Sequence, residues 1–319
     1  MTDPEALVAG EVLIDFIPET PGPLATVESF TRRPGGAPAN VAVGLARLDR
    51  TPWFCTALST DPFGQRLRTA LTEEGIPERY FTTEADRRTA LAFVAHDETG
   101  DREFTFYRDD TADTHLDTGV VPDATLDSVA AVVVGGVTLT VEPARSATLD
   151  LIERASEGGC TVVFDPNERP ELWDPGVDRR ETIERALAGV DVLKASREDL
   201  AELGIEPGAD SPEELLDHGP HAAFLTRGSE GAELVAGEGS PWGAGAWDHP
   251  GYEPDGVVDA TGAGDAFTAG VVAALVDGEG PAETLAVANA VAAAATTARG
   301  AMTALPDRDA VERLRADRG

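Results

Sequence analysis

One stretch of the sequence combines closely spaced glycines with two aspartates, Asp259-Ala-Thr-Gly-Ala-Gly-Asp265. Its glycines allow a tight turn, so the backbone N–H groups of Gly262, Ala263 and Gly264 at a helix start can point at one anion. A carboxylate beside a bound phosphate would repel it, unless that carboxylate accepts a proton from an attacking hydroxyl group. We therefore predict phosphoryl transfer, with Asp265 as the catalytic base.

Other interpretations of this stretch are open. An isolated Asp265 is also typical of the first turn of a helix, where it interacts with the helix dipole. A dinucleotide site is less consistent, because G-x-G-x-x-G requires a third glycine where Phe267 stands. The phosphate loop G-x-x-x-x-G-K-[ST] is excluded, since the only lysine, Lys194, follows Leu193. We expect no lysine near the phosphates.

A second glycine-rich stretch, Gly35-Gly36-Ala-Pro-Ala-Asn40, opens a run rich in Ala and Val. The two glycines let a ligand approach the backbone closely, and Pro38 suits a first helical turn. Asn40 can both donate to and accept from a pair of hydroxyl groups. Without a ligand, Asn40 is simply a residue near the start of a helix.

Together these stretches resemble the two signatures of the ribokinase and phosphofructokinase-B family of carbohydrate kinases, in the family's order and over essentially the whole chain. The resemblance implies a ribokinase-like α/β fold. It also implies transfer of the γ-phosphate of ATP to a sugar hydroxyl, with ATP and Mg²⁺ as cofactors and a sugar and ATP as small-molecule partners.

The resemblance assigns further residues. Asp15, in Gly10-Glu-Val-Leu-Ile-Asp15, matches an aspartate that hydrogen-bonds to sugar hydroxyls, although an aspartate on the wet face of a strand explains it too. The nucleotide is expected to border the segment 225–231, which supplies Thr226, Gly228 and Gly231. Asn289 falls near the adenine pocket of relatives, and an exposed helical asparagine is the alternative.

The sequence departs from the family at the NxxE element that organises Mg²⁺ through water, where it has Ser196-Arg-Glu-Asp199. We expect Asp199, rather than Glu198, to hold the metal and its waters. A helix capped by Ser196 with an acidic first turn explains the same residues. Asp259 and Thr261 match positions near a monovalent cation, so K⁺ is an expected further ion.

Three segments, 10–18, 104–108 and 165–173, look closest to the fructokinase branch of the family. The 2-keto-3-deoxygluconate kinase branch is similar in the last two, and its acidic substrate would need cationic partners such as Arg108 and Arg169. Those arginines would otherwise steer ATP, hold the lid or form structural ion pairs, and Tyr107 offers a ring face or a hydroxyl.

We expect a ketohexose, most simply fructose. The keto-deoxy acid, and a catalytically silent sugar-binding protein on the same fold, are the alternatives. The sequence leaves open which hydroxyl is phosphorylated.

Apolar runs alternate with amphipathic runs along most of the chain, which predicts a mainly parallel sheet with helices on both faces. The predicted strands are 6–9, 53–58, 131–134, 161–165, 190–194 and 222–226. The predicted helices are 39–48, 63–74, 142–156, 180–187, 196–203, 265–275, 281–297 and 307–315.

Two segments instead alternate with period two. They are 11–17, and 89–95 followed after a turn at 97–101 by 102–108. They predict a small second sheet that forms a lid, from about 11–32 and 88–108, within a single domain of residues 1–319. The tract 237–256 is expected to be a surface loop or a short hairpin.

The charge is strongly negative: 58 Asp and Glu against 25 Lys and Arg give a formal net charge of −33. Nucleic acid and anionic membranes are poor partners for such a chain, and adaptation to high salt is expected, with an acidic mesophilic enzyme as the alternative. Two cysteines are too few for a disulfide framework. We expect a cytoplasmic protein without a membrane span, and a homodimer through the lid strands.

Overall fold

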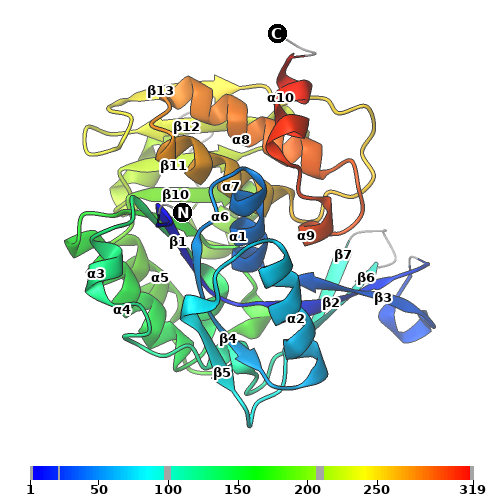
Figure 1. Cartoon of the computed structure of the whole chain (residues 1–319). Helices are drawn as coiled ribbons and strands as arrows, with labels where there is room; N and C mark the ends of the chain where they lie inside the picture. The colour runs from blue at the N-terminus through cyan, green and yellow to red at the C-terminus, as the bar shows by residue number, and fades with distance from the viewer. Residues whose placement is uncertain (1–2, 21, 97–101, 206–211, 317–319) are drawn as a thin grey trace.

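The computed structural model describes residues 3–20, 22–96, 102–205 and 212–316. At its centre is a nine-stranded sheet in the order β13-β12-β11-β10-β9-β8-β1-β4-β5 (Figure 1). The pairings from β11 to β5 are parallel, and only those that β12 makes with β11 and β13 are antiparallel. The strands are β1 Ala6–Ala9, β4 Trp53–Ser59, β5 Phe81–Glu84, β8 Ala131–Gly135, β9 Thr161–Asp165, β10 Val192–Ser196, β11 Ala222–Thr226, β12 Ala232–Ala236 and β13 Gly245–His249.

Helices cover both faces of this sheet, as the unbroken apolar runs of its strands require. Successive strand residues alternate between two hydrophobic clusters: Val8 and Val133 pack with α1, α7 and α8, whereas Leu7 and Val132 pack with α4 and α5. The predicted fold class is therefore confirmed. The helices are α1 Ala37–Arg47, α2 Pro62–Glu73, α3 Asp123–Leu126, α4 Ala144–Glu157, α5 Arg179–Leu187, α6 Arg197–Leu203, α7 Ala263–Val276, α8 Pro281–Ala295, α9 Ala301–Ala304 and α10 Arg308–Ala316.

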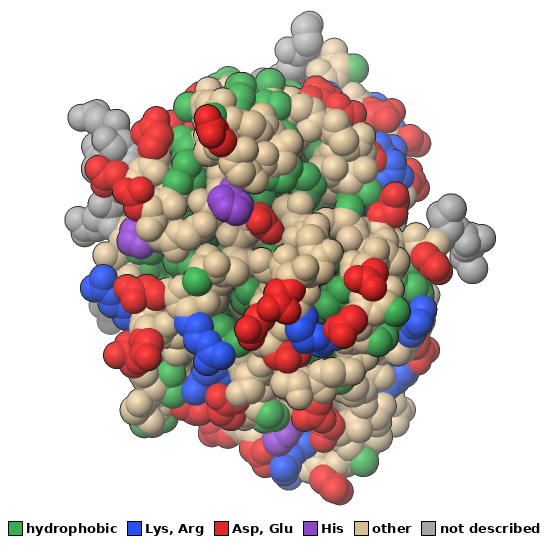
Figure 2. Space-filling model, turned by 90° about the vertical axis from the view of Figure 1, so that its left-hand side faces the viewer, with side chains coloured by type: hydrophobic (Ala, Val, Ile, Leu, Met, Phe, Trp, Pro, Cys, Tyr) green, Lys and Arg blue, Asp and Glu red, His purple; other side chains and the backbone are tan. Residues whose placement is uncertain are grey.

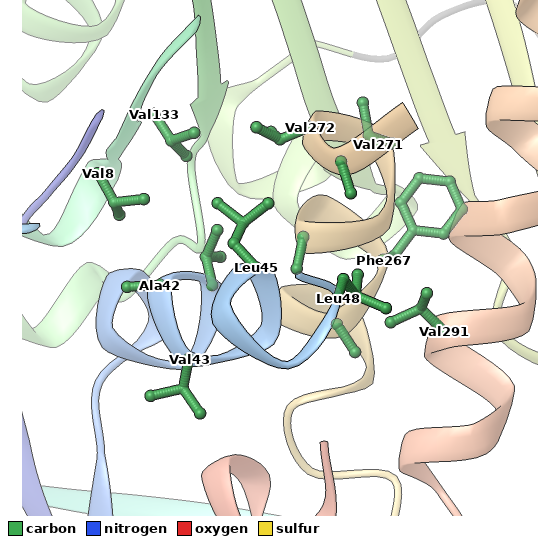
Figure 3. Close-up of a cluster of buried hydrophobic side chains, with 14 of the residues drawn as sticks. Val8, Ala42, Val43, Leu45, Leu48, Val133, Phe267, Val271, Val272 and Val291 are labelled. Atoms are coloured by element: carbon green, nitrogen blue, oxygen red, sulfur yellow. The ribbon is translucent and has the colours of Figure 1, made fainter. Parts of the chain in front are cut away.

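Helices α1, α7 and α8 lie against one another in the first of these clusters. Figure 3 shows side chains of α1, α7 and α8 meeting those of β1 and β8 there. Two glycines allow the close approach: a Cβ atom at Gly44 would lie 2.8 Å from the Cβ atom of Ala269, and one at Gly270 would lie 2.7 Å from the Cα atom of Ala288. Both glycines therefore serve packing.

The predicted second sheet is present, in the order β3-β2-β6-β7. Its strands are β2 Leu13–Pro18, β3 Phe30–Gly35, β6 Leu91–His96 and β7 Arg102–Tyr107. The β2–β3 and β6–β7 pairs are antiparallel and the β2–β6 pair is parallel, so the sheet is mixed. The predicted turn at 97–101 lies outside the described residues. The sheet stands beside α2 and α9 (Figure 1), and residues 10–12 alone join β1 to β2.

Strands β3, β5 and β12 and the four-residue helices α3 and α9 were not predicted from the sequence, and β10 begins two residues later than predicted. The strand does not begin at Val190 because the Val190 N–H group donates to the Leu187 carbonyl oxygen and so continues the turn after α5. The tract 237–256 is partly a hairpin, because β13 pairs with β12. Among the described residues, no helix has the length and hydropathy needed to cross a membrane.

Candidate active site

Two cavities meet at the carboxyl ends of the parallel strands, where α/β proteins place their ligands. Asn167, Arg169 and Gly264 line both of them. The inner cavity, of about 290 Å³, lies between the small sheet and the start of α7, and the outer cavity has about 580 Å³. The inner cavity is lined by Glu11, Leu13, Asp15, Gly36, Ala37, Asn40, Phe104, Phe106, Arg108, Val137, Asn167, Arg169, Thr261, Gly262, Gly264, Asp265 and Ala301.

Asp265 stands in the first turn of α7 and lines the inner cavity with only 7% of its surface exposed. Its Oδ2 atom accepts a hydrogen bond of 2.7 Å from Nδ2 of Asn40, and Nδ2 of Asn167 lies 3.5 Å from Oδ1. Burial raises the pKa of Asp265 to about 7, although the Asn40 hydrogen bond opposes the shift. A carboxyl group with such a pKa is suited to general base catalysis near neutral pH.

The N-terminus of α7 is open to an anion. Gly262 precedes the helix with φ of +79°, a conformation that favours glycine, and no side chain caps this end. In the first turn, the backbone N–H groups of Gly264 and Asp265 have no acceptor four residues back within the helix, whereas that of Ala263 donates to the Ala260 carbonyl oxygen at 3.2 Å. Because Gly264 lines both cavities, these donors lie where the two cavities meet.

Lys194 also lies at this point, and this corrects the expectation that no lysine is near the phosphates. It lines the outer cavity, and its Nζ atom lies 2.9 Å from the position that a Cβ atom of Gly264 would occupy. Nζ donates to Oδ2 of Asp165 at 2.9 Å, and the same oxygen accepts from the Thr268 hydroxyl at 3.0 Å. Burial opposes the charged form, but the Asp165 and Asp199 carboxylates outweigh it and raise the pKa of Lys194. The ammonium group stays protonated there.

Asp15 projects from β2 into the inner cavity, together with Gly36. Gly35 makes room for it, since a Cβ atom at Gly35 would lie 2.0 Å from Oδ2 of Asp15. Burial raises the pKa of Asp15 to about 7, and the positive charge of Arg169 opposes the shift. The structure therefore brings the predicted residues Asp15, Asn40 and Asp265 to one cavity.

Arg108 and Tyr107 lie on opposite faces of the small sheet. Arg108 lines the inner cavity, but its Nε atom donates to Oδ2 of Asp113 at 2.6 Å and its Nη1 atom to the Thr140 hydroxyl at 3.0 Å. Tyr107 is 59% exposed and borders a separate hollow with Phe93 on the outer face. Tyr107 therefore does not line the inner cavity, because side chains alternate along β7 and the inward positions belong to its neighbours.

Thr226 and Gly228 line the outer cavity, as expected for nucleotide contacts. Gly231 does not line it. With φ of +83°, Gly231 ends the turn before β12. Asn289 is buried within α8, donates to the Leu285 carbonyl oxygen at 2.8 Å and lines neither cavity. The predicted adenine contact of Asn289 is therefore absent from the two cavities, because its amide is turned into its own helix.

The candidate metal residues differ in how far they are engaged. Both Asp199 oxygens accept hydrogen bonds, from the Ser196 N–H and hydroxyl groups and from the Glu168 N–H group, in a capping box at the start of α6. Glu198 is exposed and lines the outer cavity. Asp259 accepts from the N–H and hydroxyl groups of Thr261 and from the Gly300 N–H group. Glu198, and not Asp199 as expected, therefore has the carboxylate that is more available to a metal ion.

Several residues of the site were not predicted from the sequence. Glu11 and Asn167 line the inner cavity, and Lys194 lines the outer one. A glutamate inside the apolar run 6–14, and one lysine in a chain that otherwise uses arginine, were signals that could have found two of them.

The chain matches the model of the pfkB family carbohydrate kinases over residues 3–308. A fructokinase from Klebsiella pneumoniae is 36% identical over 314 residues, which cover 96% of this chain and 97% of the relative. The chain belongs to the pfkB carbohydrate kinase family.

Solved structures agree with this assignment. A fructokinase from Xylella fastidiosa with bound ATP superposes with a TM-score of 0.85 at 30% identity, covering 98% of both chains. A double mutant of a Vibrio cholerae fructokinase, in a form with fructose, ADP and potassium ion bound, gives a TM-score of 0.82 at 31% identity and covers 98% of this chain and 99% of that one. As a pfkB carbohydrate kinase, this chain is a sugar phosphotransferase with the ribokinase-like fold.

Proposed function

We propose that this pfkB kinase transfers the γ-phosphate of ATP to a hydroxyl group of fructose, with Asp265 as the base. The observation that carries the proposal is the position of Asp265, which lines the inner cavity beside Gly264, a residue common to both cavities. The fructokinases among its relatives support the choice of sugar.

In the proposed reaction the sugar occupies the inner cavity and ATP the outer one. The sugar hydroxyl gives its proton to Asp265, its oxygen bonds to the γ-phosphorus, and the bond between that phosphorus and the β,γ-bridging oxygen breaks to release ADP. The N–H groups at the start of α7 and the Lys194 ammonium group stabilise the negative charge on the transferred group. Asn40 holds the Asp265 carboxylate in place at 2.7 Å.

Charge in the inner cavity favours a neutral sugar over 2-keto-3-deoxygluconate. The Arg108 guanidinium is already paired with Asp113, and both side chains are buried. Arg169 donates to the Glu168 carbonyl oxygen and faces the Asp15 carboxylate. Because carboxylates of the chain already offset the charge of both arginines, a substrate carboxylate would gain little from them and would meet Asp15 and Glu11.

The test is sugar-dependent release of ADP with fructose, 2-keto-3-deoxygluconate, ribose and a nucleoside as substrates. We expect the highest kcat/KM with fructose, and NMR of the product identifies the phosphorylated hydroxyl. Asp265→Asn is the control for a contaminating kinase. Preference for the keto-deoxy acid would overturn the choice of sugar, and absence of ADP release with every sugar would favour a silent binding protein.

We further propose Mg²⁺ as a cofactor. Within the described parts of the chain, no three His, Cys, Asp or Glu side chains gather into a site that could hold a metal by themselves. This fits Mg²⁺, which is commonly held by one or two carboxylates, water and substrate phosphates. Glu198 and, through water, Asp199 are the carboxylates we assign to it, and when bound it would neutralise phosphate charge. Activity that persists in excess EDTA would contradict this assignment.

K⁺, high salt and a homodimer complete the proposal. The loop of Asp259 and Thr261 is the candidate K⁺ site. A comparison of activity in KCl and in tetramethylammonium chloride tests this assignment.

We also propose a cytoplasmic location, which the two free, buried cysteines support. Tyr107 and Phe93 on the outer face of the small sheet offer apolar surface to a second copy. Light scattering in concentrated KCl tests the dimer.

A further inference from the structure

Glu11 lies in the three-residue connection between β1 of the large sheet and β2 of the small sheet, and it lines the inner cavity. Only 2% of its surface is exposed. The backbone N–H groups of Glu11 and Ala37 lie close enough to the carboxylate to favour its charged form, but its Oε2 atom has no hydrogen-bond partner. A buried carboxylate oxygen without a partner is costly, so its retention calls for an explanation.

Arg108 lines the same cavity from the end of β7, and it has an unused hydrogen-bond donor where Glu11 has an unused acceptor. Its Nε and Nη1 atoms are bonded to Asp113 and Thr140, whereas its Nη2 atom is buried without a partner. Glu11 and Arg108 interact electrostatically, yet they form no ion pair within 4.0 Å. Two residues that line the inner cavity thus have one unused acceptor and one unused donor that do not satisfy each other.

A hydroxyl group is the ligand that suits such a pair, since it donates one hydrogen bond and accepts others. A carboxylate can only accept, so it would satisfy Arg108 and leave Glu11 facing a second negative charge. We propose that Glu11 and Arg108 together recognise a hydroxyl group of the sugar and make the kinase selective for neutral over acidic sugars. This inference rests on the proposed function and assigns specificity to a residue that does not act in the phosphoryl transfer.

The test substitutes glutamine for Glu11, which replaces a hydrogen-bond acceptor with a donor and keeps the shape of the side chain. In Glu11→Gln the amide oxygen can take over the backbone N–H groups, which leaves the amide NH₂ group at the position of Oε2. We expect the KM for fructose to rise roughly 10-fold or more, because a hydrogen bond to a charged group is lost and a donor faces a donor. The KM for ATP and kcat at saturating fructose should change less than about threefold, since Asp265 is untouched.

Monodeoxy analogues of fructose separate recognition from a structural role. If Glu11 accepts from one hydroxyl, the analogue without that hydroxyl loses affinity with the wild-type enzyme and loses little more with Glu11→Gln, whereas the other analogues lose affinity in both steps. Calorimetric binding without ATP gives this result independently of turnover. The ratio of kcat/KM for fructose to that for 2-keto-3-deoxygluconate should also fall about 10-fold or more in the variant.

Glu74→Gln is the matched control, because Glu74 pairs with Arg47 at 2.6 Å away from both cavities. It should leave the fructose KM unchanged. Equal losses for every deoxy analogue would overturn the inference while leaving the proposed function intact. Absence of fructose phosphorylation by the wild-type enzyme would instead refute the proposed function. If Glu11→Gln does not fold, Glu11→Ala with the same analogues gives the same decision.

Discussion

Asp265, which we propose as the base, shows what burial does to a carboxylate. In water an aspartate is ionised far below neutral pH and is a weak base, whereas desolvation in the inner cavity raises the pKa of Asp265 to about 7. The short hydrogen bond from Asn40 and the longer one from Asn167 fix its orientation without restoring the full solvation of the charge. Base strength and position therefore come from the same packing.

Asp265→Asn should lower kcat by roughly 100-fold or more while leaving ATP binding nearly unchanged, because the substitution removes the base and keeps the volume. Steady-state kinetics give kcat, and calorimetry with a nonhydrolysable ATP analogue gives the affinity. Turnover close to the wild-type value would refute the role of Asp265 as the base.

The pH dependence follows from the same raised pKa. A base must be ionised to act, so kcat/KM should rise with pH through about 7 and level off above it. Because Asp15 also has a pKa raised to about 7, Asp15→Asn is the control and should keep the rising limb. A profile that is flat between pH 5.5 and pH 8.5 (roughly 1.5 pH units either side of the pKa, where a single titration is nearly complete) would contradict the assignment.

Stability should depend on this carboxyl group in the opposite sense. A folded-state pKa above the unfolded one means that Asp265 favours folding below the unfolded value, and that this contribution is lost as the pH rises through about 7. The ionised form is thus the active one and the less stable one.

At the residue scale the sequence was most informative where chemistry and glycines coincide. Asp15, Asn40 and Asp265 were predicted and lie around one cavity. Tyr107 was misplaced because a run of aromatic residues does not show which face of a strand is inward. Lys194 was missed because its ion pair with Asp165 joins the neighbouring strands β10 and β9, which no local pattern reveals.

At the scale of elements, α7 is held in place by α1 and α8, and it carries Asp265 at its first turn. Gly270→Ala should destabilise the protein by about 1 to 3 kcal/mol, because the new methyl group would lie 2.7 Å from the Cα atom of Ala288 and would push the two helices apart. Denaturant unfolding measures the loss. Gly256→Ala is the control, since no atom lies within 4 Å of the added Cβ atom, and an equal loss there would show that packing is not the cause.

The small sheet should respond to substrate. Its strands β2 and β7 line the inner cavity, to which we assign the sugar, and a closed site would prevent the base from activating water and so hydrolysing ATP. We expect amide hydrogen exchange in segments 11–17 and 102–108 to slow about 10-fold or more with fructose and a nonhydrolysable ATP analogue, while α4 on the opposite side of the large sheet changes little. Unchanged exchange in both segments would show that the sheet is not a lid.

Helices and strands were predictable from the sequence wherever the periodic spacing of apolar residues continued over enough residues. The helices of seven or more residues and the central parallel strands fall within a few residues of their predicted bounds, whereas the four-residue helices α3 and α9 were not predicted. Strands β3, β5 and β12 were missed because each is short and mixes polar residues into its run, so only their partner strands in the sheet stabilise the extended conformation.

At the scale of the whole molecule the dominant feature is charge. Figure 2 shows acidic side chains scattered over the visible face, with fewer basic ones among them. The net charge of −33 concentrates repulsion in the compact state. About 0.1 M salt leaves a Debye length near 10 Å, so many of these carboxylates still repel one another, whereas about 1 M salt reduces it to about 3 Å.

The melting temperature should therefore rise by about 5 °C or more between about 0.1 M and 2 M KCl, and activity should rise with it. Salt also screens the attraction of ATP to the site, but the oriented N–H groups of a closed site are screened less than the exposed surface. Differential scanning calorimetry in KCl gives the stability without the general salting-out effect of sulfate. A flat or falling melting temperature would show that the acidic surface is not a salt adaptation.

The only lysine of the chain is 4% exposed and ion-paired at the meeting point of the two cavities. In the native state, reagents that acylate primary amines should therefore find little to react with except the α-amino group of the chain. Labelling of Lys194 then requires the site to open, so the rate of its acylation, followed by mass spectrometry, reports the opening free energy at one defined place. Bound nucleotide should slow that rate in proportion to its occupancy, which makes unmodified protein its own sensor of ligand binding without any engineered probe.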